Sequence, residues 1–562
     1  MRFRRIFPML IYSAIILLPL LLPLLAPDTP HEFDMFFHLE RISEFYRQLK
    51  EGHIFPGWST RLAFGFGSPV LMFNWSLPYY IASIALSFGA TLLESFKFVT
   101  AFTYIGSFTS MYVFLAALTN PPAALVGAAW YIWAPYRFDI VQLRGAIGET
   151  TAMVFWPGIF WTTLLMFRKQ YARGFFIGTI IWALLLYSHP DLFIMILPLW
   201  FVIILAETLL TKNIRALMGS LQAFGMSLGL MAFYLIPSYL EYHYLGYKLH
   251  ENIYTQNFVL WEQLLAQPKL MEFGLSWGSL FKSIGWPLIA VALVSTLLCI
   301  ADFRRVVADR IRAYRLIFLG MAGFAIFLLR PLSTVLWDHI PFLAFITYPQ
   351  RFLGLMAFSV SVLAGLLAAG TTKRHPWIAI VMISGLILFD YPFVNLNSVR
   401  DSAESLSVRT LDTTDVWGEF MPKDMPKDFI INGRVYAQQP IVTVTPPNTI
   451  SPQCSQTSVS ITCRINSTRP VAVRFRQFYF PGWTAYADTD SIPINKHTDG
   501  TILLSLPKPT QTVRIVFIQT RLRVFSKFLT IIFAGWYIVL GVKTLYTYIR
   551  TFGKNQLPHE HF

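Results

Sequence analysis

The stretch FPMLIYSAIILLPLLLPLLA, residues 7–26, decides the fold class of this chain. It has no charged residue, and it is long enough to cross a bilayer as one α-helix, which needs roughly 20 residues. The residues before it, MRFRR, carry three arginines. Because the apolar run is longer than an ordinary signal-peptide core, we expect a retained anchor with its basic end in the cytoplasm.

The composition of the whole chain agrees with this interpretation. Of the 562 residues, 55% are hydrophobic and 13% are charged, and the mean hydropathy is +0.52. A soluble globular surface cannot be built from such a composition. The net charge of +15 is typical of cytoplasmic loops that follow the positive-inside rule. The sequence has no basic stripe with interleaved aromatic residues, so we do not expect it to bind nucleic acid.

Twelve further apolar runs follow, so we expect about thirteen transmembrane helices in all. The runs are residues 77–92, 98–118, 121–136, 150–167, 174–188, 191–210, 217–237, 283–301, 316–332, 351–369, 376–393 and 528–547.

Short basic loops predict the orientation. The basic segments expected in the cytoplasm are 168–173, 212–215, 304–315 and 373–374. These loops all predict the same orientation. The chain must cross the membrane an odd number of times between the first outer loop and the cytoplasmic Arg168, but four apolar runs lie between them. We therefore expect one run to be split, re-entrant or misassigned, and the run 98–118, with its polar centre at 107–110, is the first choice.

The orientation places the hydrophilic segment 395–525 outside the membrane, together with the first outer loop, 27–76. The long segment alternates as strands do, for example in VAVRFRQF (471–478), and turn signals such as Asp499-Gly500 separate the runs. We expect an all-α polytopic bundle over 1–394, a β-sandwich-like domain over 395–525, and a final helix with a cytoplasmic tail over 526–562.

Two cysteines lie in this hydrophilic segment. Cys454 and Cys463 have eight residues between them and a strand-like setting. A disulfide would suit an oxidising compartment, and two unpaired thiols are the alternative.

The first outer loop begins with PHEFDMFFH, residues 30–38. Asp34 and His38 are four residues apart and would share one face of a helix. A carboxylate at the membrane surface can act as a general base on a hydroxyl, and Glu32 with Asp34 and His38 could also hold a divalent cation such as Mg²⁺ or Mn²⁺. The alternative is a solvated loop whose acids cap a juxtamembrane helix.

Further charged residues lie between apolar runs on the same side. Arg137, Asp139, Arg144 and Glu149 could form two structural ion pairs, or an anion site in which Arg144 binds a phosphate. Arg351 at a helix start opposes the helix dipole, so we expect it to meet an anionic headgroup or a carboxylate such as Asp338.

Spaced motifs along almost the whole chain resemble the bacterial integral-membrane family labelled "6-pyruvoyl-tetrahydropterin synthase related". The segment FYFPGW, residues 478–483, resembles the extracytoplasmic β-domain of membrane proteins similar to YfhO. The motifs that carry the first resemblance are Asp34-x-x-x-His38-Leu39, Gly52-x-x-x-Pro56-x-Trp58, Arg144-Gly145-Ala146 with Glu149, Ser188-His189, Pro237 with Glu241, and Pro341 with Tyr348-Pro349-x-Arg351-Phe352.

Both families look like members of the glycosyltransferase C (GT-C) superfamily. The resemblance implies an inverting transferase of the bacterial inner or plasma membrane. Such an enzyme moves a sugar from a polyprenyl-phosphate donor to an extracytoplasmic glycan, lipid or protein, with an essential acid in the first outer loop. Glu32 replaces the first acid of the common Asp-x-Asp pattern, which leaves a metal requirement open.

The charged clusters and the resemblance together predict three sets of site residues. Asp34 would be the base, with Glu32 and His38 assisting. The donor phosphate would meet Arg144, Arg351 and Arg137. The residues expected to line the substrate site are Trp58, Glu149, His189, Glu241 and Tyr348.

Two other functions fit the same residues. A carrier or flippase for lipid-linked saccharides would bind its cargo with similar arginines and aromatic rings, but its charges should be distributed through the depth of the spans. A noncatalytic assembly protein of the cell envelope would use the β-domain for binding and would tolerate loss of Asp34.

Overall fold

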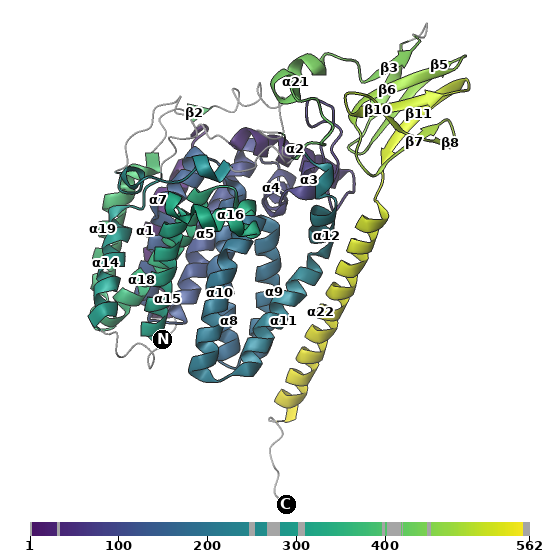
Figure 1. Cartoon of the computed structure of the whole chain (residues 1–562). Helices are drawn as coiled ribbons and strands as arrows, with labels where there is room; N and C mark the ends of the chain where they lie inside the picture. Colours follow the sequence, from purple (N-terminus) through teal and green to yellow (C-terminus); the bar gives the residue numbers. More distant parts are fainter. Residues whose placement is uncertain are drawn as a thin grey trace, which may run out of the picture.

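The structure is a computed structural model, and it describes residues 3–30, 34–246, 253–266, 282–301, 310–395, 400–401, 418, 420–446 and 451–554. Long helices run roughly side by side in a bundle, and a β-domain lies beyond one end of it (Figure 1). The helices are α1 (Phe3–Leu21), α2 (Met35–Lys50), α3 (Val70–Phe73), α4 (Leu77–Ser87), α5 (Leu92–Ala116), α6 (Pro121–Trp133), α7 (Pro135–Phe138), α8 (Ile147–Phe167), α9 (Tyr171–Ser188), α10 (Pro190–Thr211), α11 (Ile214–Leu230), α12 (Ala232–Leu240), α13 (Trp261–Leu264), α14 (Trp286–Ala301), α15 (Arg310–Leu328), α16 (Thr334–His339), α17 (Pro341–Ile346), α18 (Phe352–Thr372), α19 (Trp377–Asp390), α21 (Phe429–Ala437) and α22 (Arg521–Lys554).

The described residues include eight helices that are long and apolar enough to cross a membrane, or nine if the bent pair α11 and α12 forms one span. The chain is therefore a multi-pass membrane protein, but the expected thirteen spans are not confirmed. Helices α4, α6 and α14 coincide with predicted runs, yet they have only 11, 13 and 16 residues. A helix of that length is shorter than the roughly 20 residues that a simple span needs.

The run 98–118 is not split, although its polar centre made it the first choice for a split span. The suspected run, 98–118, lies in α5, which is a continuous helix of 25 residues. Thr91 and Glu94 cap its start reciprocally, so α5 has a well-defined N-terminus. Helix α4 is shorter than a simple span needs, because its 11 residues span only about 17 Å. It lies at the bundle end beside α2 and α3 (Figure 1).

Helices α8 and α18 form the buried centre of the bundle. Helix α6 packs closely on α18 because both carry glycine at the contact. A Cβ on Gly127 would lie 2.8 Å from the carbonyl oxygen of Ser361, and one on Gly365 would lie 3.3 Å from that of Ala123. Larger side chains at either position would push these two helices apart.

The C-terminal region is a β-domain of two antiparallel sheets. One sheet has the order β3-β6-β10-β9 and the other β4-β5-β11-β7-β8. The strands are β3 (Val442–Thr445), β4 (Gln453–Gln456), β5 (Ser460–Ser467), β6 (Val471–Phe478), β7 (Trp483–Ala487), β8 (Asp490–Ile492), β9 (Asn495–Lys496), β10 (Thr501–Leu506) and β11 (Thr510–Phe517), and a separate short pair joins β1 (Thr29–Pro30) to β2 (Arg400–Asp401).

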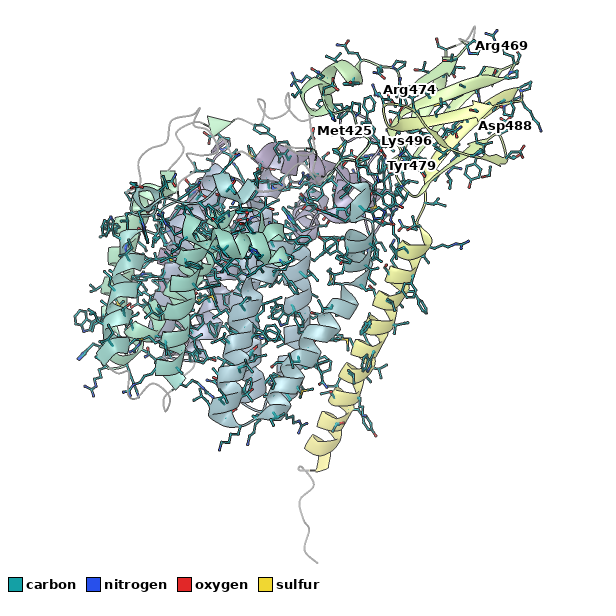
Figure 2. The ribbon with its side chains drawn as sticks, in the orientation of Figure 1. Met425, Arg469, Arg474, Tyr479, Asp488 and Lys496 are labelled. Carbon is teal, nitrogen blue, oxygen red and sulfur yellow. A yellow bond between two sulfur atoms is a disulfide. The ribbon has the colours of Figure 1, made fainter. Side chains whose placement is uncertain are left out.

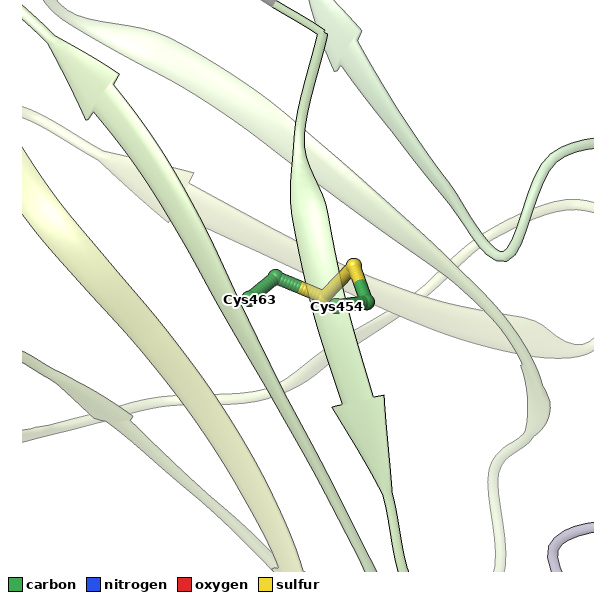
Figure 3. The surroundings of a disulfide bond; sticks show 2 residues. All are labelled: Cys454 and Cys463. Atoms are coloured by element: carbon green, nitrogen blue, oxygen red, sulfur yellow. A yellow bond between two sulfur atoms is a disulfide. The ribbon is translucent and has the colours of Figure 1, made fainter.

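Apolar and polar residues alternate along β6 as the sequence predicts: Val471, Val473 and Phe475 face the core between the two sheets. Cys454 of β4 and Cys463 of β5 are directly opposite each other and form a disulfide (Figure 3).

The β-domain does not have a separate core. Trp58, Phe66 and Phe73 of the first outer loop belong to the same buried cluster as the inner residues of the two sheets. Met425, Tyr479 and Lys496 lie on the side of the β-domain toward the helices, whereas Arg469 and Asp488 lie toward its outer end (Figure 2). The first outer loop and the β-domain are thus one packed unit at one end of the bundle.

A labelling experiment tests the orientation of this unit. In a Cys299→Ser background, we expect an impermeant maleimide to label Ile54→Cys in the first loop and Arg514→Cys in β11 from outside intact cells. The control is Gln170→Cys, in the basic loop between α8 and α9, which should react only after membrane rupture. All three positions are exposed. Labelling of Ile54→Cys and Arg514→Cys from opposite sides would contradict the shared unit.

Candidate active site

A cavity of about 710 Å³ lies where the first outer loop meets the helix bundle. The first outer loop, the loop before α8, the junction of α9 and α10, helix α12 and the segment from α17 to α18 all contribute to its wall. Its polar lining residues include Asp34, His38, Arg41, Asn74, Arg144, Glu149, His189, Asp191, Tyr348 and Arg351.

The carboxylate of Glu149 accepts hydrogen bonds from three side chains in the cavity wall. Arg144 donates both terminal nitrogens to it, over 2.7 and 3.1 Å. Arg351 donates Nε over 3.0 Å, and the hydroxyl of Tyr136 donates over 2.9 Å. Glu149 and Arg144 are buried, and buried charges are tolerated only when they are paired and hydrogen-bonded. The contacts tie the start of α8 to the start of α18.

Arg351 extends this network to a third helix. Its Nη1 donates to the carboxylate of Asp191 at the start of α10 and, over 2.7 Å, to the carbonyl oxygen of Ile346. The guanidinium also lies 5.2 Å from the ring centre of Tyr348. Three sequence-distant helix ends therefore meet through two guanidiniums and two carboxylates.

Asp34 precedes α2 and is partly exposed at the cavity wall. Its backbone N–H donates to the carbonyl oxygen of Arg144 over 2.8 Å. Among the residues that the structure describes, its carboxylate has no hydrogen-bond or ion-pair partner. Burial raises the pKa of Asp34 to about 6, against the opposing effect of the Arg144 guanidinium. Such a carboxylate is ionised at neutral pH and can still accept a proton.

An aromatic group forms the wall next to Asp34. The ring of Trp75 lies 5.3 Å from that of His38 and 5.8 Å from that of His189. His38 also shares a hydrogen bond of 3.2 Å with the hydroxyl of Tyr79. Burial lowers the pKa of His38 well below its usual value, so its imidazole is neutral at pH 7. A Cβ on Gly148 would lie 2.3 Å from Trp75, so the close approach of this ring requires glycine at the start of α8.

Seven residues expected in the site do line the cavity. They are Asp34, His38, Arg144, Glu149, His189, Tyr348 and Arg351. Glu32 lies outside the described residues.

Arg137, expected to meet the donor phosphate, does not line the cavity. It is buried inside the bundle, where its Nη2 donates to the carbonyl oxygen of Thr103 over 2.9 Å and to Ser107 over 3.1 Å. Its guanidinium also packs on the ring of Tyr104. The contacts with α5 hold this arginine away from the cavity.

Trp58 and Glu241 also lie outside the cavity wall. Trp58 is fully buried among Phe480, Trp483 and Phe517 of the β-domain, so it has no face for a sugar ring. Glu241 accepts a 2.8 Å hydrogen bond from Arg523, which joins the end of α12 to the start of α22. Both side chains hold the β-domain in place.

Arg351 has carboxylate partners, but Asp338 is not one of them. Asp338 accepts a hydrogen bond from the hydroxyl of Tyr254, and Arg351 pairs with Glu149 and Asp191 instead. The expectation of a carboxylate was correct, but proximity in the chain did not identify it.

Arg41 and Trp75 are lining residues that the sequence interpretation did not place in the site. Arg41 follows Asp34 by seven residues and His38 by three, and this spacing puts all three on one face of α2. The same periodicity could have identified it. No local pattern in the sequence indicates that Trp75 packs between His38 and His189.

The described residues contain no group of three His, Cys, Asp or Glu side chains that could hold a metal ion. Asp34 and His38 alone do not form such a group.

No known family model matches the chain, and no curated protein matches it. Similar solved structures include the Archaeoglobus fulgidus oligosaccharyltransferase in complex with Zn and sulfate. That match has a TM-score of 0.40 and 15% identity, over 72% of this chain and 53% of the other. The archaeal oligosaccharyltransferase AglB from Archaeoglobus fulgidus, with an inhibitory peptide and a dolichol-phosphate, gives a TM-score of 0.40 and 14% identity, over 72% and 56%. This chain thus spans about half the length of the solved chains that it matches.

The charge network predicts a large cost for neutralising Glu149. We expect Glu149→Gln to lower the free energy of unfolding by about 3 kcal/mol, because Arg144 and Arg351 would lose their shared counter-charge in a buried setting. Thermal unfolding in lipid nanodiscs measures the change. The control is Glu262→Gln on the short helix α13, an exposed position where stability should stay the same. Equal stability of the two variants would contradict the role of Glu149.

Proposed function

We propose that this chain is a membrane glycosyltransferase with its active site in this cavity. It moves a sugar from a polyprenyl-phosphate-linked donor to a hydroxyl of an extracytoplasmic glycan, lipid or protein, with inversion at the anomeric carbon. The observation that carries the proposal is the carboxylate of Asp34, which is free of described partners and shares the cavity with the paired guanidiniums of Arg144 and Arg351.

The acceptor hydroxyl attacks the anomeric carbon of the donor sugar. A new C–O bond forms there while the bond from that carbon to the phosphate oxygen breaks, and the phosphate leaves with the electron pair. Asp34 takes the proton of the attacking hydroxyl. A phosphate is a good leaving group, so a base on the acceptor and cations on the phosphate are the groups that this reaction needs.

Arg144 and Arg351 are the cations for the departing phosphate. Each keeps N–H groups that the carboxylate contacts do not use. Nη2 of Arg351 has no hydrogen-bond partner among the described residues, and each terminal nitrogen of Arg144 uses one of its two N–H groups on Glu149. Hydrogen bonds between guanidinium and phosphate are charge-assisted and strong. Glu149 and Asp191 keep both arginines oriented before the donor arrives, so little reorganisation is required during the reaction.

The same cavity has an apolar wall suited to the lipid part of a donor. Ile194 of α10, Leu235 of α12 and Phe345 of α17 line it, and the side chain of Phe345 is 48% exposed. An isoprenoid chain that packs there would bury apolar surface. The polar and apolar walls together fit an amphipathic donor.

Substitution of the proposed base tests the proposal. Asp34→Asn keeps the size of the side chain but removes the basic carboxylate, so we expect turnover to fall by about 10² to 10⁴ while donor affinity is retained. Purified protein in lipid is given a panel of polyprenyl-phosphate sugars, and release of the carrier phosphate is measured.

Asp428→Asn, at an exposed acid before α21, is the control and should retain turnover. Full turnover of Asp34→Asn would remove Asp34 from catalysis. Donor binding without carrier release in the wild-type protein would favour the carrier or flippase.

The pKa of Asp34 predicts how turnover depends on pH. The base works in its ionised form, so kcat/KM should rise with pH and reach half its maximum near pH 6. At pH 5 the rate should be roughly a tenth of its plateau, because only about a tenth of such a carboxyl is then ionised. Initial rates between pH 5 and 8 measure the profile, and a flat profile in folded protein would contradict the proposed base.

A further inference from the structure

Helix α2 carries polar side chains along one face from the cavity to the β-domain. Asp34, His38 and Arg41 line the cavity at its first end. Gln48, seven residues after Arg41, continues the same face at the other end. The helix has 16 residues and is therefore about 24 Å long.

Gln48 is fully buried and holds the chain that follows α2. Its side-chain nitrogen donates to the carbonyl oxygen of Trp58 over 3.0 Å, and its side-chain oxygen accepts from the backbone N–H of Gly57 over 2.9 Å. Ser59 adds a 2.7 Å hydrogen bond to the carboxylate of Glu44, one turn earlier on α2. The far end of α2 is thus joined to residues 57–59.

Residues 57–59 are in turn held by the β-domain. The indole N–H of Trp58 donates to Gln477 of β6 over 3.2 Å, and Gln477 donates to the carbonyl oxygen of Gly65 over 2.7 Å. A Cβ on Gly67 would lie 2.5 Å from both Gln477 and Trp58, so this close contact requires glycine. Glu51, just after α2, accepts a hydrogen bond from the backbone N–H of Ser458 over 3.0 Å.

The cavity end of α2 is held by the bundle. The backbone N–H of Asp34 donates to the carbonyl oxygen of Arg144, and His38 is hydrogen-bonded to Tyr79. Arg144 also donates hydrogen bonds to Glu149. The helix therefore connects the network that orients the two arginines with the core of the β-domain.

We propose that Gln48 is a positioning residue, through which the β-domain fixes helix α2 and so the place of the Asp34 carboxylate relative to Arg144 and Arg351. The inference rests on the proposed function. A displacement of about 1 Å at a reacting group can cost roughly 10²-fold in rate. The Asp34 carboxylate has no hydrogen-bond or ion-pair partner among the described residues that would correct its position. The guanidiniums that meet the donor are oriented by Glu149 and Asp191, which lie outside α2. The position of α2 should therefore affect turnover far more than donor affinity.

Gln48→Met tests this role, because it keeps the length of the side chain and removes both hydrogen bonds. We expect kcat per folded protein to fall by about 10 to 100-fold, with donor affinity within twofold of the wild type. The matched control is Tyr131→Phe in α6, which removes one buried hydrogen bond, from Tyr131 to the carbonyl oxygen of Met153. It should leave kcat unchanged.

A distance measurement adds a readout other than activity. Spin labels at Lys50→Cys and Arg514→Cys, in a Cys299→Ser background, report how α2 lies relative to the β-domain. The distance distribution should be narrow with Gln48 present and broader in Gln48→Met, and Tyr131→Phe should leave it narrow. Ser59→Ala removes the hydrogen bond to Glu44 and the longer one, of 3.4 Å, that Ser59 Oγ accepts from the backbone N–H of Leu62. It serves if Gln48→Met does not fold; a smaller loss of kcat, about 3 to 10-fold, is then expected.

The outcomes separate this inference from the proposed function. Full turnover of Asp34→Asn would overturn the proposed function. An inactive Asp34→Asn together with wild-type kcat and an unchanged distance distribution in Gln48→Met, or in folded Ser59→Ala, would overturn the positioning role alone. A loss of donor affinity equal to the loss of kcat in Gln48→Met would show a general disturbance of the cavity and would also overturn that role.

Discussion

The pairing of Glu149 with two guanidiniums is the interaction on which the cavity depends. Arg144 is near it in the chain, but Arg351 is 202 positions away. Taking such charges out of water is costly, and the cost is offset only when each charge has partners in a fixed geometry. The ends of α8, α10 and α18 are therefore held at set positions. The shape of the cavity follows from that requirement.

The carboxylates that line the cavity differ in whether they are paired with an arginine. Glu149 and Asp191 neutralise and orient the arginines, whereas Asp34 has no such partner among the described residues. The carboxylates of the cavity thus have two different roles, and the groups next to each carboxylate decide which role it has. Paired carboxylates organise the wall, and the unpaired carboxylate keeps the capacity to accept a proton.

The first outer loop belongs to two parts of the molecule at once. Its start enters the cavity of the bundle, and Trp58 and Phe66 enter the core of the β-domain. A division into a transmembrane part and a separate outer domain describes the chain order but not the packing. Gln477 and Glu241 hold the two parts together through hydrogen bonds with Trp58 and Arg523.

Local patterns in the sequence determined the membrane class, the alternating strands of the β-domain, the facing of Cys454 and Cys463, and the presence of an acid at the start of the first outer loop. Each depends on hydropathy or spacing within a short segment. Helix length at α4 and the choice between Arg137 and Arg144 as a cavity residue were decided by tertiary structure. So were the packing of Trp58 and the pairing of Arg351 with Glu149 and Asp191 in place of Asp338. The physical reason is that a polar or aromatic side chain takes its role from the groups that enclose it, and for these residues the enclosing groups come from segments far away in the chain.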